Sequence, residues 1–175
     1  NQGLTAGQRS AKRTFDVVAG LIAAVIAAPF MIIIALAIKL YDGGPVFFTH
    51  ERLTRDGKAF KIYKFRSMRV QQEQKGYCLT RKNDDRITPV GKIIRKLHLD
   101  ELPQIINIVK GDMSFVGPRP ETPALAAEYC ERLPEFSFRL KVKAGLTGYA
   151  QVYGRYNTTP EDKLKMDLTY IEKYS

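Results

Sequence analysis

The sequence predicts a small, mostly helical α/β domain that is attached to a membrane. Residues 17–38 are 22 consecutive positions without a charged or polar side chain, about 33 Å of helix, which is enough to enter or cross a hydrocarbon core. Asp56-Gly57 is a hairpin signal between two short apolar runs. Thr88-Pro89 and Gly111 are typical of helix starts and stops. A length of 175 residues favours a single domain.

The composition is that of a basic, folded protein. Apolar residues make up 45% of the chain, which excludes a disordered chain. The 28 Lys and Arg against 18 Asp and Glu give a net charge of +10, so the partners are anions: nucleic acid, an anionic membrane surface or phosphorylated substrates. Cys78 and Cys130 form no disulfide framework and are expected to be reduced thiols.

The apolar segment is predicted to be a membrane helix. A buried core helix is a weaker alternative, because a helix this long and apolar on every face is rare in a small domain. A cleaved signal peptide is another alternative, but its apolar region would be shorter. Pro29 interrupts the segment, and basic residues flank it on both sides. A broken, re-entrant helix would satisfy the positive-inside rule at both ends, and a kinked spanning helix that tolerates the proline is an equal alternative.

The remaining chain is expected to form a hairpin followed by short amphipathic surface helices. The hairpin strands are predicted near 46–49 and 59–65, and a polar loop is predicted over 70–87. The first helix after Pro89 has an apolar stripe at positions 90, 93, 94 and 97. A second helix ends near Lys110, residues 122–133 and those from Pro160 onward are predicted helices, and 145–154 are predicted as loop or strand.

Adjacent carboxylates mark a candidate site in Leu99–Gln104, of sequence LDELPQ. Pro103 is tolerated only in a first helical turn, so Asp100 is expected near a helix N-terminus, where free amides favour an ionised carboxylate. Asp100 and Glu101 would suit a hard divalent cation shared with substrate phosphates. The alternative is a capping residue beside a solvated acid.

Several cations surround this run in the sequence. Arg119 stands between two prolines, which restrict the loop that carries it, and arginine suits bidentate phosphate recognition. The alternative for each cation is a solvated surface charge. The other basic residues near the site are Lys61, Lys64, Arg66, Arg69, Arg95 and Lys96. His50 and His98 are assigned no role.

Three blocks of the sequence resemble a known family. They are 60–68 (FKIYKFRSM), 99–104 with 110–120 (LDELPQ and KGDMSFVGPRP), and 145–155 (GLTGYAQVYGR). Together they are similar to the monotopic phosphoglycosyl transferases, the bacterial sugar transferases that start exopolysaccharide, capsule or O-antigen units. The resemblance covers nearly the whole chain.

The resemblance implies a transferase that moves a sugar 1-phosphate from a UDP-sugar to undecaprenyl phosphate and releases UMP. It implies that Asp100 is the nucleophile of a covalent phospho-sugar intermediate and that Glu101 binds Mg²⁺. Arg95 and Arg119 match phosphate-contacting and nucleotide-contacting arginines. Further substrate-binding candidates are Lys64, Arg66 and Arg155. The expected partners are these substrates and anionic membrane lipids, not nucleic acid, at the cytoplasmic face of the bacterial inner membrane.

The resemblance also favours the re-entrant course, with residues 13–40 as a membrane helix-break-helix and 41–175 as the cytoplasmic part of a single catalytic domain. Ala28 stands where the family has Ser before the proline, a departure that bears on the sharpness of the turn. The chain begins with Asn1 and stops at Ser175, soon after the third block. We therefore expect the catalytic, C-terminal part of a longer protein.

Two other functions fit part of the sequence. A basic, membrane-anchored binding module would explain the charge and the apolar segment, but not the Pro-Arg-Pro run or the Asp-Glu-Leu-Pro break. A membrane glycosyltransferase would pass the sugar without its phosphate and release UDP instead of UMP. The sequence names neither the sugar nor the oligomeric state.

Overall fold

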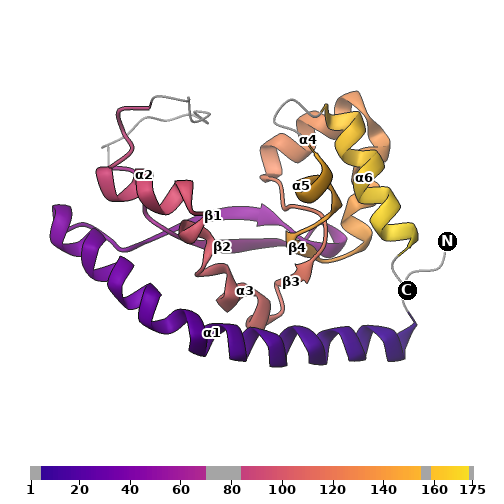
Figure 1. Ribbon diagram of the computed structural model, residues 1–175. Coiled ribbons are helices and arrows are strands. Elements are labelled where there is room, and N and C mark those ends of the chain that lie inside the picture. The colour runs from indigo at the N-terminus through magenta and orange to yellow at the C-terminus, as the bar shows by residue number, and fades with distance from the viewer. Residues whose placement is uncertain (1–4, 70–83, 155–158, 174–175) are drawn as a thin grey trace.

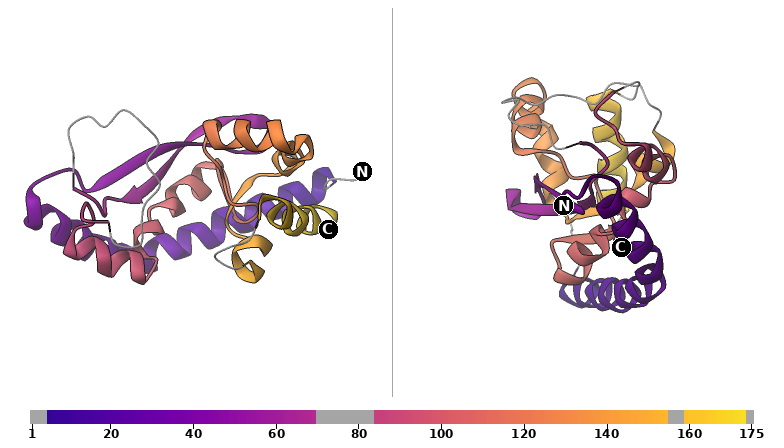
Figure 2. Two further views of the ribbon diagram at one scale, coloured as in Figure 1. Left: turned by 90° about the horizontal axis from the view of Figure 1, so that it is seen from above. Right: turned by 90° about the vertical axis from the view of Figure 1, so that its left-hand side faces the viewer.

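The computed structural model describes residues 5–69, 84–154 and 159–173 and confirms a mostly helical α/β architecture. The described strands form two two-stranded sheets, β1–β2 antiparallel and β3–β4 parallel. The other elements lie on one side of the long helix α1, with α2 toward its C-terminal end (Figure 1), and the right-hand view in Figure 2 shows the same arrangement from the end of the molecule. The helices and strands are α1 (Ala6–Asp42), β1 (Phe47–Leu53), β2 (Ala59–Phe65), α2 (Pro89–Lys96), α3 (Gln104–Lys110), β3 (Met113–Val116), α4 (Pro123–Arg132), β4 (Ala144–Thr147), α5 (Tyr149–Tyr153) and α6 (Pro160–Glu172).

Helix α1 associates the chain with the membrane. It begins at a capping box between Thr5 and Gln8 and ends at Gly43, which has the left-handed φ of 69°. Only 17% of its most apolar stretch is buried, whereas the core helix of a soluble protein would be mostly buried. Its exposed large apolar residues include Phe15, Val18, Leu21, Ile22, Val25, Ile26, Phe30, Ile32, Ile33 and Leu36.

The predicted break at Pro29 does not divide α1 into two helices. The helix is continuous from Ala6 to Asp42 with Pro29 inside it, and its ribbon bends part-way along (Figure 1). A proline removes one backbone hydrogen bond and crowds the preceding turn, which bends a helix without ending it when neighbouring turns hold. Whether the bent helix spans the membrane or returns to the same face stays a prediction.

Polar contacts fasten the N-terminal half of α1 to the rest of the chain. Arg13 donates to the backbone oxygens of Ile108 and Val109 at 2.7 and 2.6 Å, which satisfies carbonyls at the end of α3. Asp16 is 2% exposed and accepts from Ser114 Oγ at 3.1 Å and from the Phe115 amide at 3.2 Å. The apolar helix is therefore docked on the rest of the chain and is not a detached anchor.

The hairpin confirms the predicted turn, with a longer first strand than the predicted 46–49. The strands pair from Phe47 with Phe65 to Leu53 with Ala59. Phe60 and Ile62 on β2 pack with Ile108 of α3 in one core cluster, and Phe65 packs with Ile38 and Ile94 in another. Strand β2 therefore joins both cores and fixes the position of the basic residues that it carries.

Local signals also located the helices around the candidate site. Thr88 accepts from the Gly91 amide at 2.9 Å, Pro89 occupies the first turn of α2, and Gly111 ends α3 with φ 97°. The apolar stripe of α2 is only partly confirmed, because Ile94 is buried while Ile93 and Leu97 are 62% and 58% exposed. The predicted loop over 70–87 lies mostly outside the described residues.

The region 145–154, predicted as loop or strand, contains both β4 and the short helix α5. Strand β4 runs parallel to β3, and the Gly145 amide donates to the Pro118 oxygen at 2.9 Å. The Gly117 amide donates to the Thr147 oxygen at 2.8 Å. These bonds position the Pro-Arg-Pro loop that follows β3. The helices predicted over 122–133 and from Pro160 are confirmed by α4 and α6.

We expect Gly145→Ala to destabilise the fold by about 1–3 kcal/mol, the usual cost of overpacking. A Cβ atom at Gly145 would overlap the backbone of Gly117, which cannot move without shifting the Pro-Arg-Pro loop. Thermal unfolding of the purified variant measures this. The control is Gly7→Ala on α1, where a Cβ atom meets nothing within 4 Å. Equal melting temperatures for the two variants would contradict the prediction.

Candidate active site

Two cations from distant parts of the chain hold the Glu101 carboxylate. Lys64 Nζ, on β2, lies 2.8 Å from Oε1, and Arg119 Nη2, after β3, lies 2.6 Å from the same oxygen. Burial alone would raise the pKa of Glu101, but the hydrogen bonds and charges of Arg119 and Lys64 lower it to about 2. Glu101 is therefore ionised at any working pH, and it orients both cations.

Asp100 precedes Glu101 in the same turn but has a different environment. Burial raises the pKa of Asp100, the charge of Glu101 adds to the rise, and the charges of Lys64 and Arg95 oppose it. No hydrogen bond from a cationic side chain to this carboxylate is present among the described contacts. Of the two acids, Asp100 is thus the one whose oxygens are available to react.

The predicted helix start at Asp100 needs a correction. Asp100 lies in a 3₁₀ turn, Leu99–Glu101, and α3 begins only at Gln104, with Pro103 at its N-cap position. His98 precedes the turn with a left-handed φ of 55°. Asp100 is therefore not the N-cap residue of α3, and the charge of Lys64, a backbone hydrogen bond and the charge of Arg95 favour its ionised form.

The structure gathers five of the predicted site residues into one cluster. Lys64 comes from β2, Arg95 from the last turn of α2, Asp100 and Glu101 from the 3₁₀ turn, and Arg119 from the Pro-Arg-Pro loop. An acid pair with convergent cations is the arrangement that phosphoryl transfer requires, because the cations stabilise charge on the transferring group.

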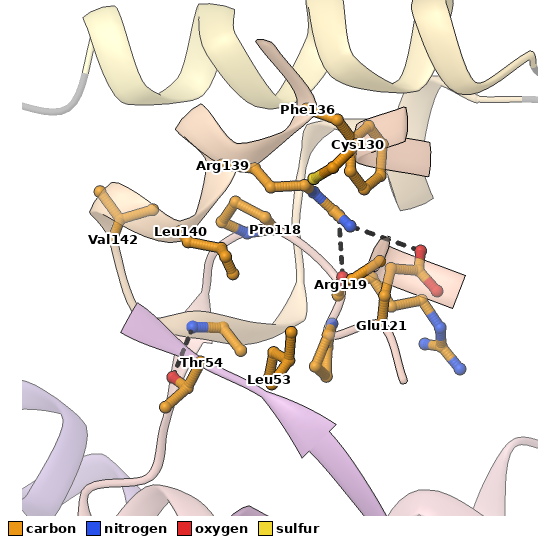
Figure 3. A pocket seen from close by; sticks show the side chains of 13 residues that line it. Leu53, Thr54, Pro118, Arg119, Glu121, Cys130, Phe136, Arg139, Leu140 and Val142 are labelled. Carbon is orange, nitrogen blue, oxygen red and sulfur yellow. Dashed lines mark hydrogen bonds and ion pairs between the residues drawn. The ribbon is translucent and has the colours of Figure 1, made fainter. Parts of the chain in front are cut away.

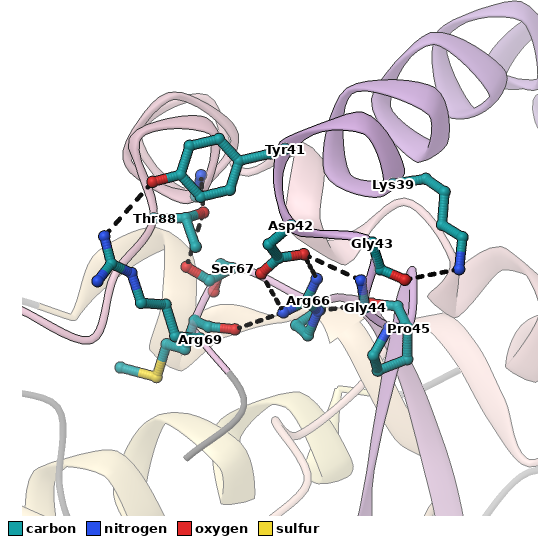
Figure 4. A network of polar contacts seen from close by, with 12 residues as sticks. Lys39, Tyr41, Asp42, Gly43, Gly44, Pro45, Arg66, Ser67, Arg69 and Thr88 are labelled. Atoms are coloured by element: carbon teal, nitrogen blue, oxygen red, sulfur yellow. Dashed lines mark hydrogen bonds and ion pairs between the residues drawn. The ribbon is translucent and has the colours of Figure 1, made fainter.

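Arg66 is not part of this cluster. Its guanidinium is 7% exposed and forms a bidentate ion pair with Asp42 at the end of α1, while Nε donates to the Pro45 oxygen at 2.5 Å (Figure 4). The structure thus uses Arg66 to hold the C-terminal end of α1 against β2. Arg155, the last predicted substrate-binding residue, lies outside the described residues.

A buried ion-pair network behind the Pro-Arg-Pro loop was missed by sequence reasoning. Arg139 is 4% exposed, and its Nη2 donates to the Arg119 oxygen at 2.8 Å (Figure 3). Its Nε donates to Asp167 Oδ2 at 3.0 Å, and Nη1 lies 3.4 Å from Glu121 Oε1. Asp167 follows Leu164 by three positions and lies on the same buried face of α6. An acidic residue on the apolar face of a helix indicates a buried partner, and this was the signal that the sequence offered.

The pocket beside this network is too small for a substrate. It measures about 20 Å³, room for one water molecule, and Pro118, Cys130 and Phe136 are among its lining residues (Figure 3). The lining includes Arg119 but neither Asp100 nor Glu101. This space is therefore not the binding site of a substrate that reacts at Asp100.

Several exposed apolar residues lie close to the acid pair in the sequence. Ile93 and Leu97 on α2 are exposed, within one or two helical turns of Asp100 in sequence, and Ile106 on α3 is 41% exposed. Exposed large apolar groups beside a membrane helix are typical of a protein surface that contacts lipid.

Comparison with known proteins identifies the chain. Residues 7–175 match the family described as bacterial sugar transferase. The chain belongs to this family. This bacterial sugar transferase is 41% identical over 167 residues to UDP-N-acetylgalactosamine-undecaprenyl-phosphate N-acetylgalactosaminephosphotransferase of Aeromonas hydrophila. It is 40% and 39% identical to UDP-glucose:undecaprenyl-phosphate glucose-1-phosphate transferases of Escherichia coli and Caulobacter vibrioides.

These relatives are longer proteins. The alignments cover 94%, 98% and 94% of this bacterial sugar transferase but 40%, 38% and 63% of the three relatives in the same order. The matched part includes α1 and all the residues of the acid and cation cluster. The similarity therefore applies to the membrane helix and the candidate site together.

Proposed function

We propose that this bacterial sugar transferase moves a sugar 1-phosphate from a UDP-sugar to undecaprenyl phosphate and releases UMP, the first membrane step in making a polysaccharide or glycoconjugate. The observation that carries the proposal is the Asp100–Glu101 pair, with Lys64 and Arg119 on Glu101, next to an exposed apolar surface. The names of the relatives cited above support the same donor and acceptor.

In the first step, an Asp100 carboxylate oxygen attacks the phosphorus that carries the sugar. The new bond is a carboxylate oxygen–phosphorus bond, and the bond that breaks joins that phosphorus to the oxygen shared with the other phosphate, so UMP leaves. Arg119 and Lys64 would stabilise the negative charge of the diphosphate, as bound cations do in other phosphoryl transfer enzymes. Because Asp100 has a weakly paired carboxylate, it is the better nucleophile of the two acids.

In the second step, a phosphate oxygen of undecaprenyl phosphate attacks the same phosphorus. The bond to Asp100 breaks, the carboxylate is restored, and the product is a lipid diphosphate sugar. Both substrates are anions, so the positive charge of Arg95 near Asp100 would assist the binding of each of them. The apolar surface at Ile93 and Leu97 suits the polyprenyl chain of the acceptor.

The residues present fit a bound Mg²⁺ that is shared with substrate. No group of three or more His, Cys, Asp or Glu side chains that could hold a metal occurs in the part of the chain that the structure describes. Mg²⁺ commonly uses one or two carboxylates with substrate phosphates and water. Glu101 would hold it, since Oε2 makes only one long contact, 3.5 Å to Arg119. The ion would neutralise charge on the diphosphate when bound.

Glu101→Gln is expected to lower kcat/KM by at least about tenfold, because the neutral amide weakens metal binding and loosens Lys64 and Arg119. Excess Mg²⁺ should restore part of the activity by mass action. Steady-state kinetics across a Mg²⁺ titration measure both effects. The control is Glu128→Gln on α4, whose ion pair with Arg132 is exposed and should not affect activity. A Mg²⁺ dependence identical to that of wild type would contradict a metal role for Glu101.

We also propose a re-entrant course for α1, with both ends on the cytoplasmic face of the bacterial inner membrane. The basic residues Arg9, Lys12 and Arg13 precede the apolar stretch, and Lys39 follows it. A cysteine introduced by Gly7→Cys, with Cys78→Ser and Cys130→Ser as background, should react with an impermeant maleimide only after permeabilisation. Labelling in intact cells would show that α1 spans the membrane.

The nucleotide released distinguishes the proposed function from its alternatives. The enzyme is incubated with undecaprenyl phosphate, Mg²⁺ and a panel of UDP-sugars, and the soluble nucleotide is identified by chromatography. Release of UMP with one or more donors supports sugar 1-phosphate transfer. Release of UDP would identify a glycosyltransferase that leaves the phosphate behind, and release of neither would favour a binding module.

A further inference from the structure

A second basic site lies at the N-terminal end of α1, apart from the Asp100 cluster. It is an open hollow of about 880 Å³ between the first turns of α1, the hairpin turn and the segment before β4. None of the five residues of the acid and cation cluster lines it. Its charged lining residues are Arg9, Lys12, Arg13, Asp16, Arg55, Asp56, Lys141 and Lys143.

Six basic side chains and only two carboxylates line the hollow, and both carboxylates already have partners within the protein. Asp16 accepts from Ser114 and Phe115 and lies 3.9 Å from Lys12, while Asp56 lies 3.2 Å from Arg55 and is 79% exposed. The acids therefore leave most of the positive charge of this hollow uncompensated.

Lys143 is the residue around which like charges converge. Its pKa is lowered first by partial burial and then by the positive charges of Arg13 and Arg55, while the carboxylates of Asp16 and Asp112 only partly oppose this. Arg13 cannot turn away, because its guanidinium is bonded to the Ile108 and Val109 oxygens. A bound anion would offset the repulsion and complete the hydrogen bonds of Lys143 and Arg55, and phosphate has the matching geometry.

The position of the hollow indicates where its ligand comes from. Phe15 and Val18, on the next turn of α1, are 64% and 51% exposed, so the apolar surface of the helix starts beside the cationic lining. Basic residues at the start of a membrane helix lie at the level of the lipid headgroups.

We propose that this hollow binds a phosphate group, such as the phosphate of an anionic lipid headgroup, at a site separate from the reaction centre. Arg55 and Lys143 are the residues that contact it, and Arg13 supplies fixed positive charge close to Lys143. The site would fix the height and tilt of α1 at the membrane surface. Binding at this site is independent of the reaction at Asp100 and of the identity of the sugar donor.

The test measures binding of dihexanoyl phosphatidic acid to the purified chain in neutral detergent, with inorganic phosphate and dihexanoyl phosphatidylcholine as the other arms. Native mass spectrometry or ³¹P NMR titration gives the affinity. The Arg55→Gln, Lys143→Gln double variant should bind phosphatidic acid at least about tenfold more weakly, since two charge-assisted hydrogen bonds are lost. Lys143→Arg should bind as wild type does.

Lys58→Gln is the matched control, because Lys58 is exposed near the hairpin turn but does not line the hollow. Competition by inorganic phosphate would show that the phosphate group alone is recognised, and binding of the lipid without competition would show that the headgroup with its glycerol is required. Either result supports the site. Equal affinity in the double variant, checked to be folded by its circular dichroism and its transferase activity, would overturn the proposal, as would no binding by wild type.

Discussion

Replacing Asp100 with Asn is expected to lower kcat by at least about a thousandfold, as loss of a covalent nucleophile does in other enzymes. The amide keeps the size of the carboxylate but cannot form the acyl phosphate. Asn also keeps a side-chain oxygen that can accept the backbone hydrogen bond made by the Asp100 carboxylate, so the turn before α3 should persist. Turnover of UDP-sugar with undecaprenyl phosphate measures the effect, with UMP release as the readout.

The same substitution should not destabilise the protein. Burial raises the pKa of Asp100, so the folded state favours the protonated carboxyl over the charged one. The stability that protonation provides is therefore lost as the pH rises through the pKa of the folded state. At neutral pH, Asn removes that cost, and the melting temperature should stay equal or rise. Asp85→Asn, at an exposed position, is the control for both measurements. Brisk turnover by Asp100→Asn would contradict the nucleophile assignment.

Replacing Arg139 with Leu is expected to cost about 3–5 kcal/mol of folding free energy, the usual result of removing one partner of a buried ion pair. Glu121 and Asp167 would remain buried without Arg139, at 8% and 1% exposure, although Lys163 still contacts Glu121. The Pro-Arg-Pro loop would also lose the bond to the Arg119 oxygen. Urea unfolding of the purified variant measures the loss.

Arg132→Leu is the matched control for Arg139→Leu, because it breaks an Arg–Glu pair that is exposed. Arg132 and Glu128 are 74% and 49% exposed, so their pair is expected to contribute about 0–1 kcal/mol. Arg139→Lys should lie between the two variants, since a lysine keeps the charge but not the three contacts of the guanidinium. Similar losses for Arg132→Leu and Arg139→Leu would show that the buried network is not what holds the loop.

Features set by neighbouring residues could be predicted from the sequence. Thr88 and Pro89 start α2, Gly111 ends α3, and Asp56-Gly57 lies in the hairpin turn, because capping bonds and left-handed backbone depend on a few adjacent residues. Helix α5 was missed because five residues after Gly148 carry almost no periodic signal.

Features set by distant partners could not be predicted in the same way. Arg66 and Lys64 are two positions apart in a basic strand, but Arg66 pairs with Asp42 and Lys64 with Glu101. The family resemblance located Asp100, Glu101 and Arg119, while the role of Arg139 depends on partners 18 and 28 positions away. The charged residues of the sequence therefore indicated where the candidate site lies but not which cations stabilise the fold.

The reaction of the enzyme with UDP-sugar alone tests the covalent mechanism most directly. With a donor labelled in the sugar and no lipid acceptor, wild type should release about one UMP per enzyme molecule and retain the label on Asp100, as a double-displacement scheme requires. Hydroxylamine should remove the label, because acyl phosphates react with it, and Asp100→Asn should not be labelled. Release of UMP only when undecaprenyl phosphate is present, with no label on the protein, would contradict the account.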